Sequence, residues 1–180
     1  LEKPGSDRIT TAALAANLSV SEAALYRHFA SKAQMFEGLI DFIEQSVFSL
    51  VQQVMGRDGE VLEFTPEDGA RRAARIVALV LQFAERNPGM VRVLVGDALL
   101  LEHERLQVRM NQFFERIEST LRQCLRPAAG ALGSATPTVE AQVAASVLMS
   151  FVQGRLLRFV RTGFRRQPTE HLDASLAMLI

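Results

Sequence analysis

The sequence has one cysteine, no net charge and no long hydrophobic run, and each of these absences excludes a class of protein. Cys124 alone can build neither a disulfide framework nor a zinc cluster, so we interpret it as a small buried hydrophobe in a protein of the reducing cytoplasm. Twenty basic residues balance twenty acidic ones, so any nucleic-acid surface has to come from the local placement of charge. The longest apolar run, 76–84 with Gln82 inside it, is far shorter than the ~20 residues of a membrane span.

Histidines are also few, so few candidate catalytic residues or metal ligands are available. His103 and Glu104 begin a His-Glu-Xaa-Xaa-His string, but Gln107 stands where the second histidine ligand would be needed on the same helical face. Three histidines and one cysteine do not assemble a Ser-His-Asp or Cys-His set, and there is no glycine-rich phosphate loop. We therefore predict that the chain is not an enzyme and has no catalytic residue, metal or cofactor.

What the sequence does contain is helical periodicity along its whole length. No stretch alternates convincingly with period two, and 48% apolar and 22% charged residues are typical of a globular protein with a core. We therefore expect an all-α fold. The expected helices cover 12–18, 22–28, 32 to about 54, 70–86, a short segment ending near 101, 102–125, 138–164, and a last segment after Pro168-Thr169. Loops are expected at 56–65 and 126–138.

The first part of the chain has the pattern of a helix-turn-helix. Thr10 or Thr11 caps the first short helix, Ser19-Val20 makes a tight turn, and Ser21 caps the second short helix. Ser31 caps the long helix that follows. Alanines at 12, 13, 15 and 16 allow close approach of the first two helices. The second helix has a small, mostly polar leading edge at 21–24, which suits entry into a major groove ~12 Å wide.

Basic and aromatic side chains follow that leading edge. Tyr26, Arg27 and His28 lie at the end of the second helix, where donors can reach phosphate oxygens. Lys32 lies at the start of the long helix, where its ammonium and the free backbone N–H groups together make an anion site. In the alternative interpretation Tyr26 and His28 are half-buried hinge residues and Lys32 is merely solvated.

The segment "TTAALAANLSVSEAALYRHFASKAQMFEGLI" at 10–40 resembles the DNA-binding region of TetR-type regulators. Three further segments, "ERNPG", "RLQVRMNQFFERIE" and "FVRTGFRRQPT", resemble one branch of that family, the SlmA nucleoid occlusion factors, over most of the chain. Ser19 stands where the family usually has glycine, and a left-handed conformation there costs serine ~1 kcal/mol. We expect the family's first helix to be mostly missing from this chain.

The resemblance implies an all-helical TetR-like homodimer, with a helix-turn-helix DNA-binding domain at 1–44 and a larger dimerisation and partner-binding domain at 45–180. It implies a cytoplasmic, nucleoid-associated protein that binds palindromic double-stranded DNA. When bound to DNA, such a protein engages the C-terminal tail of the tubulin-like division protein FtsZ and blocks division-ring assembly over the chromosome. The DNA-facing positions carried over are Thr10, Thr11, Ser21, Ala23, Ala24, Tyr26, His28 and Lys32. The FtsZ-binding positions carried over are Phe42, Leu79, Arg86 and Asn87.

Two other functions fit parts of the sequence. A ligand-responsive transcriptional repressor of the general TetR type needs a cavity with several convergent polar groups, and the apolar region 70–101 offers few of them. A dimeric interaction protein without DNA binding is the third possibility, and salt-dependent DNA binding would exclude it.

A stripe of arginines at 155, 158, 161 and 165 has helical spacing. We interpret it as the flank of a dimer interface that pairs with acids such as Glu140, Glu170 or Asp173. A second polyanion site and a membrane-surface helix are the alternatives.

Overall fold

The computed structural model of the chain describes residues 10–17, 19–56, 65–100, 102–131 and 135–180. Within these ranges it contains helices and no strand, which confirms the all-α prediction. The elements are α1 Thr11–Asn17, α2 Glu22–His28, α3 Lys32–Met55, α4 Pro66–Arg86, α5 Pro88–Leu94, the 3₁₀ turn η1 Asp97–Leu99, α6 Glu104–Ala131, α7 Pro137–Arg161 and α8 Leu172–Leu179.

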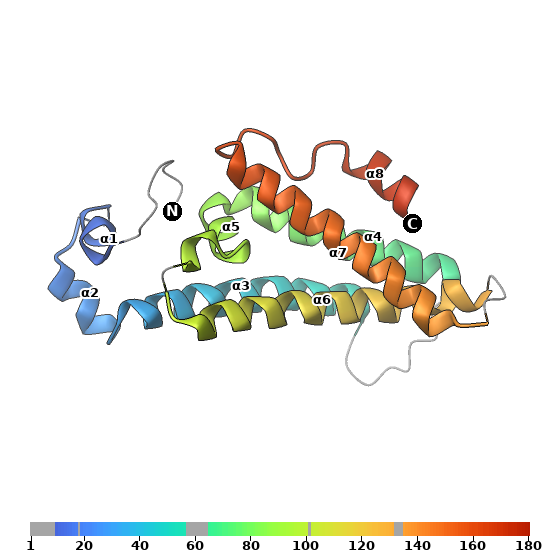
Figure 1. Ribbon diagram of the computed structural model, residues 1–180, viewed down its shortest axis with the longest axis horizontal. Helices are drawn as coiled ribbons and strands as arrows, with labels where there is room; N and C mark the ends of the chain where they lie inside the picture. The colour runs from blue at the N-terminus through green and yellow to red at the C-terminus, as the bar shows by residue number, and fades with distance from the viewer. Residues whose placement is uncertain (1–9, 18, 57–64, 101, 132–134) are drawn as a thin grey trace.

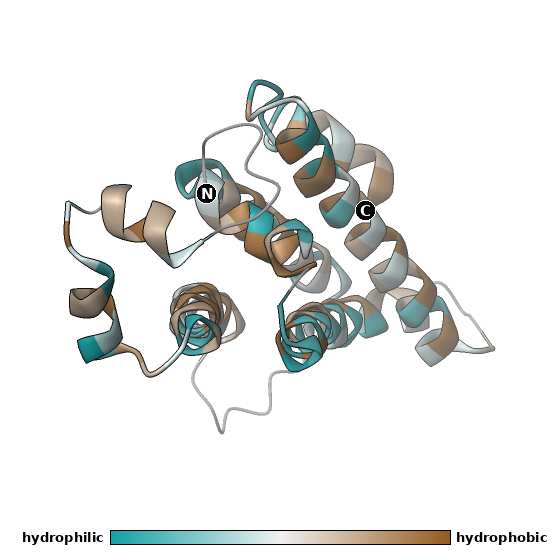
Figure 2. Ribbon diagram, turned by 60° about the vertical axis from the view of Figure 1, so that its left-hand side comes forward, coloured by the Kyte–Doolittle hydropathy of each residue, from teal (hydrophilic) through white to brown (hydrophobic). Residues whose placement is uncertain are grey.

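The long helices form a bundle, and the two short N-terminal helices lie at one end of it (Figure 1). α3 and α6 run along the long axis, α4 and α7 cover them, and α6 packs most extensively against α7 and α4. Brown and teal segments alternate along these helices in Figure 2, as expected for amphipathic helices that bury one face. The bundle therefore supplies the core, and α1 and α2 project from it.

The core is continuous through the bundle. Apolar residues of α3, α4, α6 and α7 form one buried cluster, in which Phe113 stacks edge-on against Phe48 with ring centroids 5.3 Å apart. α4 approaches α6 most closely at Gly69, where a Cβ atom would lie 2.1 Å from the carbonyl oxygen of Cys124. Cys124 is fully buried, as predicted, and burial raises the pKa of its thiol to about 11.

Several helix boundaries differ from those predicted from the sequence. α4 begins at Pro66 instead of Ala70, because the Thr65 hydroxyl accepts from the Asp68 amide at 3.2 Å and proline is favoured in the first turn. α6 continues to Ala131, so the loop predicted from 126 was wrong for 126–131. Pro127 removes one backbone donor, but alanines are strong helix formers and Ala129 is buried.

α7 begins at Pro137, one residue earlier than predicted. Two further differences arise at residues with positive φ. α7 ends at Arg161 instead of 164, because Gly163 and Phe164 adopt left-handed φ angles of 60° and 63°. The short helix predicted to reach 101 is divided into α5 and η1 by Gly96, whose φ is 78°. Most of the predicted 56–65 loop, residues 57–64, lies outside the described residues.

α7 is long and apolar enough to cross a membrane by length and composition alone. It packs instead against α6 and α4 within the bundle. A core helix passes the same test, so this composition is weak evidence for a span.

Candidate nucleic-acid interface and partner groove

Three side-chain caps define the N-terminal helices. The Thr10 hydroxyl accepts from the Ala13 amide at 3.1 Å, the Ser21 hydroxyl from the Ala24 amide at 3.2 Å, and the Ser31 hydroxyl from the Gln34 amide at 3.2 Å. Each cap satisfies one of the amide donors that a helix start leaves without an intrahelical partner. The structure confirms the caps predicted at these positions, with Thr10 in place at the first helix.

The turn between α1 and α2 uses a left-handed serine. Ser19 has φ 55°, and the Val20 amide donates to the Ala15 carbonyl at 3.0 Å, which closes the end of α1. The strained conformation expected for Ser19 is therefore observed. Across the turn the Thr11 hydroxyl donates to the Glu22 carboxylate at 2.7 Å and holds α2 against α1.

α2 contributes no buried residue. Ser21, Ala23 and His28 are exposed, Ala24 is half-buried, and Tyr26 is 46% exposed. The side chains at 26 and 28 are thus not the half-buried hinge of the alternative interpretation. Thr10, Thr11 and the α2 candidates belong to the small unit at one end of the molecule (Figure 1), and Ser21 and Ala23 at the start of α2 are exposed.

Lys32, by contrast, has a partner from the far part of the chain. Its ammonium pairs with the Glu102 carboxylate, just before α6, and lies 5.7 Å from the centroid of the Phe36 ring. The side chain is only 22% exposed, so Lys32 is not simply solvated. Lys32, which is predicted to bind a phosphate, is therefore ion-paired with Glu102, and a phosphate would have to displace the Glu102 carboxylate.

This pair begins a series of ion pairs between α3 and α6. Glu37 pairs with Arg105 at 2.8 Å, and Arg109 pairs with both Asp41 and Glu44. The hydrogen bond to Glu44 raises the pKa of Arg109 against the effect of desolvation. Sequence reasoning missed this series, although acids at 37, 41 and 44 already have the spacing of one helical face. α3 is continuous through residue 44, so the two expected domains share it.

The expected partner-binding positions include one exposed aromatic side chain, which contacts a buried one. Phe42 on α3 is 48% exposed, and its ring lies 6.4 Å from that of Phe83 on α4. Leu79 and Arg86 lie four residues before and three after Phe83, on the same face of α4. The Asn87 side chain donates to the Phe83 carbonyl at 2.8 Å and ends the helix. Phe83 was not named at the sequence level, although its helical spacing from Leu79 places it on the same face, and it belongs to the buried core.

A second concavity lies between η1, α6 and α7. It is a groove of about 410 Å³ with an apolar floor that includes Leu94, and its polar lining residues are Asp97, Gln107, Asn111 and Arg161. Only Asp97 of these comes from the region 70–101. The expectation of few polar groups therefore holds for that region, while α6 and α7 supply the others.

Comparison with known proteins agrees with this architecture. Residues 1–39 match the family described as bacterial regulatory proteins, tetR family, and residues 67–180 match the tetracyclin repressor-like, C-terminal domain of the SlmA-like type. The chain is 48% identical to the nucleoid occlusion factor SlmA of Vibrio atlanticus over 97% of this chain and 85% of that protein.

Two further relatives bear the same name. The chain is 50% identical to the nucleoid occlusion factor SlmA of Photobacterium profundum over 94% of this chain and 82% of that protein. It is 48% identical to that of Idiomarina loihiensis over 97% of this chain and 84% of the relative. The capped helix pair, the all-helical bundle and this similarity along nearly the whole chain lead to one conclusion: the protein belongs to the SlmA family of TetR-type nucleoid occlusion factors.

Proposed function

We propose that the chain binds palindromic DNA as a homodimer and that the DNA-bound dimer engages the C-terminal tail of FtsZ and blocks division-ring assembly over the chromosome. The observation that carries the proposal is the exposure of α2, a helix that buries no residue. Side-chain caps fix the start of α2 at Ser21 and the start of α3 at Ser31. A helix presented in this way fits a major groove, where its first turn reads base edges.

The DNA-facing residues divide by role in this proposal. Ser21, Ala23 and Ala24 face the bases because they lie on the first turn of α2. Thr10, Thr11, Tyr26, His28 and Lys32 contact the backbone phosphates, which position the protein without reading sequence. Lys32 reaches a phosphate by exchanging the Glu102 carboxylate for it.

FtsZ binding is assigned to the surface where α3 packs against α4. Phe42 offers an exposed aromatic surface beside Phe83, and Arg86 adds an exposed cation at the end of α4. Aromatic and arginine side chains are the residues that most often dominate the energy of protein interfaces. Leu79 and Asn87 complete the binding surface.

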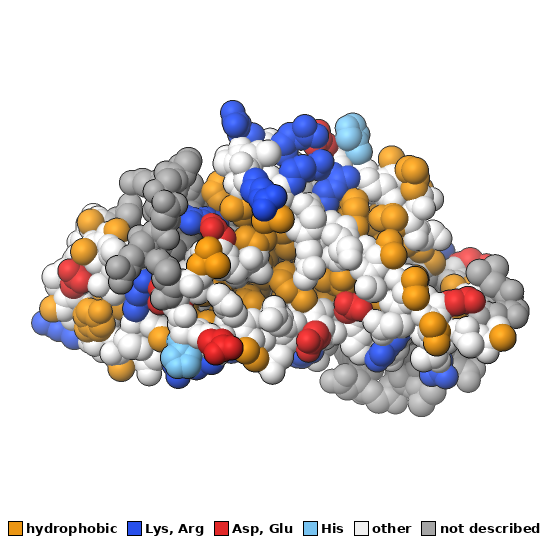
Figure 3. Space-filling model, viewed as in Figure 1, with side chains coloured by type: hydrophobic (Ala, Val, Ile, Leu, Met, Phe, Trp, Pro, Cys, Tyr) orange, Lys and Arg blue, Asp and Glu red, His pale blue; other side chains and the backbone are white. Residues whose placement is uncertain are grey.

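The homodimer is assigned to α7. Val139, Val143 and Val147 are 59%, 57% and 48% exposed and repeat every four residues along one face. Hydrophobic side chains also reach the surface over α7 and α8 in Figure 3. An exposed apolar stripe of this kind on a bundle helix suits contact with the same stripe of a second copy.

FtsZ sedimentation in the presence of GTP tests the proposal. The chain with its palindromic DNA should reduce the pelleted FtsZ, and either component alone should reduce it less. Phe42→Ala should bind DNA normally and lose the effect on FtsZ, whereas Val108→Ala, an equally exposed apolar site on α6, should keep both. If the wild-type protein and DNA together leave the amount of pelleted FtsZ unchanged, the proposal is wrong.

Localisation at the nucleoid is tested by mapping bound sites in cells. Scattered palindromes that thin out toward the replication terminus would support nucleoid occlusion. One strong site beside the protein's own gene would support a repressor instead.

The groove of about 410 Å³ supports a second candidate function, a ligand-responsive repressor. Its four polar side chains around an apolar floor have the composition of a small-molecule site. A thermal-shift screen of metabolites discriminates the two functions, because a ligand at about 100 times its Kd stabilises the folded state by about 2.7 kcal/mol.

A further inference from the structure

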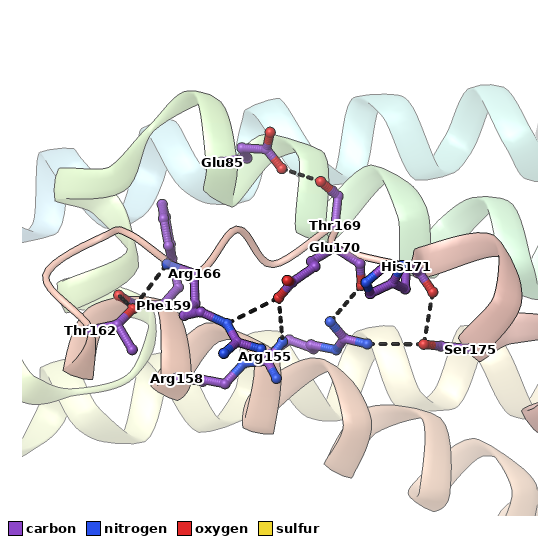
Figure 4. Close-up of polar contacts among 10 residues, drawn as sticks. All are labelled: Glu85, Arg155, Arg158, Phe159, Thr162, Arg166, Thr169, Glu170, His171 and Ser175. Carbon is purple, nitrogen blue, oxygen red and sulfur yellow. Dashed lines mark hydrogen bonds and ion pairs between the residues drawn. The ribbon is translucent and has the colours of Figure 1, made fainter.

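Three arginines contact one glutamate where α7 ends and the chain turns toward α8, two of them through its carboxylate. Arg155 and Arg158 come from α7, Arg166 comes from the connection that follows, and the carboxylate belongs to Glu170 (Figure 4). We call Arg155, Arg158 and Arg166 the arginine cluster. Blue side chains gather over this part of the surface in Figure 3, far from the α1–α2 unit. The predicted pairing with Glu170 is confirmed for Arg158 of the stripe, while Arg155 donates to the Glu170 backbone carbonyl.

The members of the cluster are held in different ways. Arg155 donates to the Glu170 carbonyl at 2.7 Å and to the Ser175 hydroxyl at 2.9 Å, and its guanidinium lies 4.8 Å from the centroid of the Phe151 ring. These contacts fix the connection to α8. Arg166 donates through Nε to the Glu170 carboxylate at 3.1 Å, while Nη2 of Arg158 lies 3.7 Å from the same oxygen, beyond hydrogen-bond distance.

Arg158 is left with donors that no described residue satisfies. Its Nε and Nη2 are buried and have no hydrogen-bond acceptor among the residues that the structure describes. Buried polar atoms are nearly always hydrogen-bonded, so a pair of unsatisfied donors on one guanidinium, with only the Glu170 carboxylate nearby, is able to accept a further anionic partner. The two atoms lie on one edge of a planar fork, the arrangement that binds two oxygens of one anion.

The charges of the cluster are also unbalanced. Three guanidinium groups against one carboxylate leave a net charge of about +2, and Arg161 and Arg165 add exposed positive charge nearby. Desolvation, together with the neighbouring Arg158, lowers the pKa of Arg155. The single glutamate therefore does not neutralise the site.

We propose that the arginine cluster binds the dianionic phosphate group of a phosphate monoester, with the Nε–Nη2 edge of Arg158 and the guanidinium of Arg166 around its oxygens. A phosphate monoester carries about −1.5 to −2 charges at pH 7, which matches the excess at the cluster. A carboxylate or a phosphodiester carries only −1 and leaves the site positive. The ligand is either a free phosphorylated metabolite or the monoester headgroup of a lipid.

Calorimetric titration of the full chain with methyl phosphate tests the assignment, with dimethyl phosphate as the singly charged diester control. Methyl phosphate should bind saturably at pH 7 and dimethyl phosphate should not. Binding should weaken below about pH 6, where the monoester takes up its second proton. Absence of saturable binding, or equal binding of the two esters, would overturn the proposal.

Variants separate a site from a general charge effect. Arg166→Gln, at a side chain 55% exposed, should weaken methyl phosphate binding by about tenfold through loss of one charge-assisted contact. Glu170→Gln should bind it several-fold more tightly, because the competing carboxylate charge is gone; a folding defect does not produce such a gain. Arg71→Gln on α4, an exposed arginine outside both sites, should bind as the wild type does. Weakening by Glu170→Gln, or an equal loss in Arg71→Gln, would overturn the site.

Vesicle flotation distinguishes the two ligand sources. Phosphatidylcholine vesicles containing phosphatidic acid should capture the wild type and not Arg166→Gln if the headgroup is the ligand. Methyl phosphate binding without capture would identify a soluble phosphate monoester. Either result supports the cluster as a phosphate site, and equal capture of both proteins would count against it.

Discussion

The helix-turn-helix unit and the bundle are built by different forces. In the bundle, α4, α6 and α7 bury apolar faces in one continuous core, whereas α2 buries no residue and α1 buries only Ala15 among the residues described. Caps, the Ser19 turn and the Thr11–Glu22 hydrogen bond hold the small unit together instead. The difference separates stability from recognition: changes in the bundle should act on folding, and changes in the small unit should act on DNA.

The largest expected effect is at the closest helix contact of the bundle. Gly69→Ala places a Cβ atom 2.1 Å from the Cys124 carbonyl oxygen, and the backbone of α6 has to move. We expect the free energy of unfolding in urea to fall by about 3 kcal/mol, the upper range for overpacking a core.

Gly38→Ala is the matched control on α3, since its Cβ would lie 3.6 Å from the Phe29 ring in ordinary contact. This variant should gain up to about 1 kcal/mol from helix propensity. Thiol labelling of Cys124 gives a second readout, because its pKa of about 11 keeps the buried thiol unreactive near pH 8 until α4 and α6 separate. Equal stability of the two variants would contradict the packing described.

The next effect concerns the ion pair that joins the two regions. Lys32→Ala should weaken binding to all DNA sequences by about tenfold and reduce the salt slope of the affinity by about one. Glu102→Gln should instead strengthen DNA binding. Lys32 then has no ion pair to break before it binds a DNA phosphate. Fluorescence anisotropy at several salt concentrations measures both. Weaker DNA binding by Glu102→Gln would show that the pair positions the unit for DNA instead of competing with it.

A smaller effect is expected at the turn. Ser19→Gly removes the cost of a left-handed φ of 55° at a residue with a side chain, a gain of about 1 kcal/mol. Slower hydrogen exchange of the α1 and α2 amides should report the gain locally, with DNA affinity retained. Faster exchange in these helices would show that the turn relaxes when Ser19 is replaced.

Local signals in the sequence predicted the helix-turn-helix well. The caps at Thr10, Ser21 and Ser31 and the left-handed Ser19 are properties of a few consecutive residues, so the printed sequence contains them. Helix ends were less predictable where residues of opposite helix propensity lie side by side. Pro127 favours the end of a helix, but the alanine-rich segment around it favours a helix, and α6 continues to Ala131.

Contacts between distant residues could not be read from the sequence. The Lys32–Glu102 pair and the Phe42–Phe83 contact join residues whose approach depends on the packing of the bundle. The arginine stripe was visible as a pattern, but the orphaned donors of Arg158 depend on the path of the chain between α7 and α8. Periodicity shows which face of a helix is buried and not which residue of another helix meets it.

In the proposed function α2 reads bases while Lys32 holds phosphates. Selection of bound duplexes from a random DNA pool separates these two roles, with the wild type, Ala24→Gln and Lys32→Ala compared in parallel. We expect one palindromic motif for the wild type, the same motif at lower affinity for Lys32→Ala, and a changed motif for Ala24→Gln. Two results would contradict these roles. One is that no motif is enriched for the wild type, and the other is that Ala24→Gln leaves the motif unchanged while Lys32→Ala changes it.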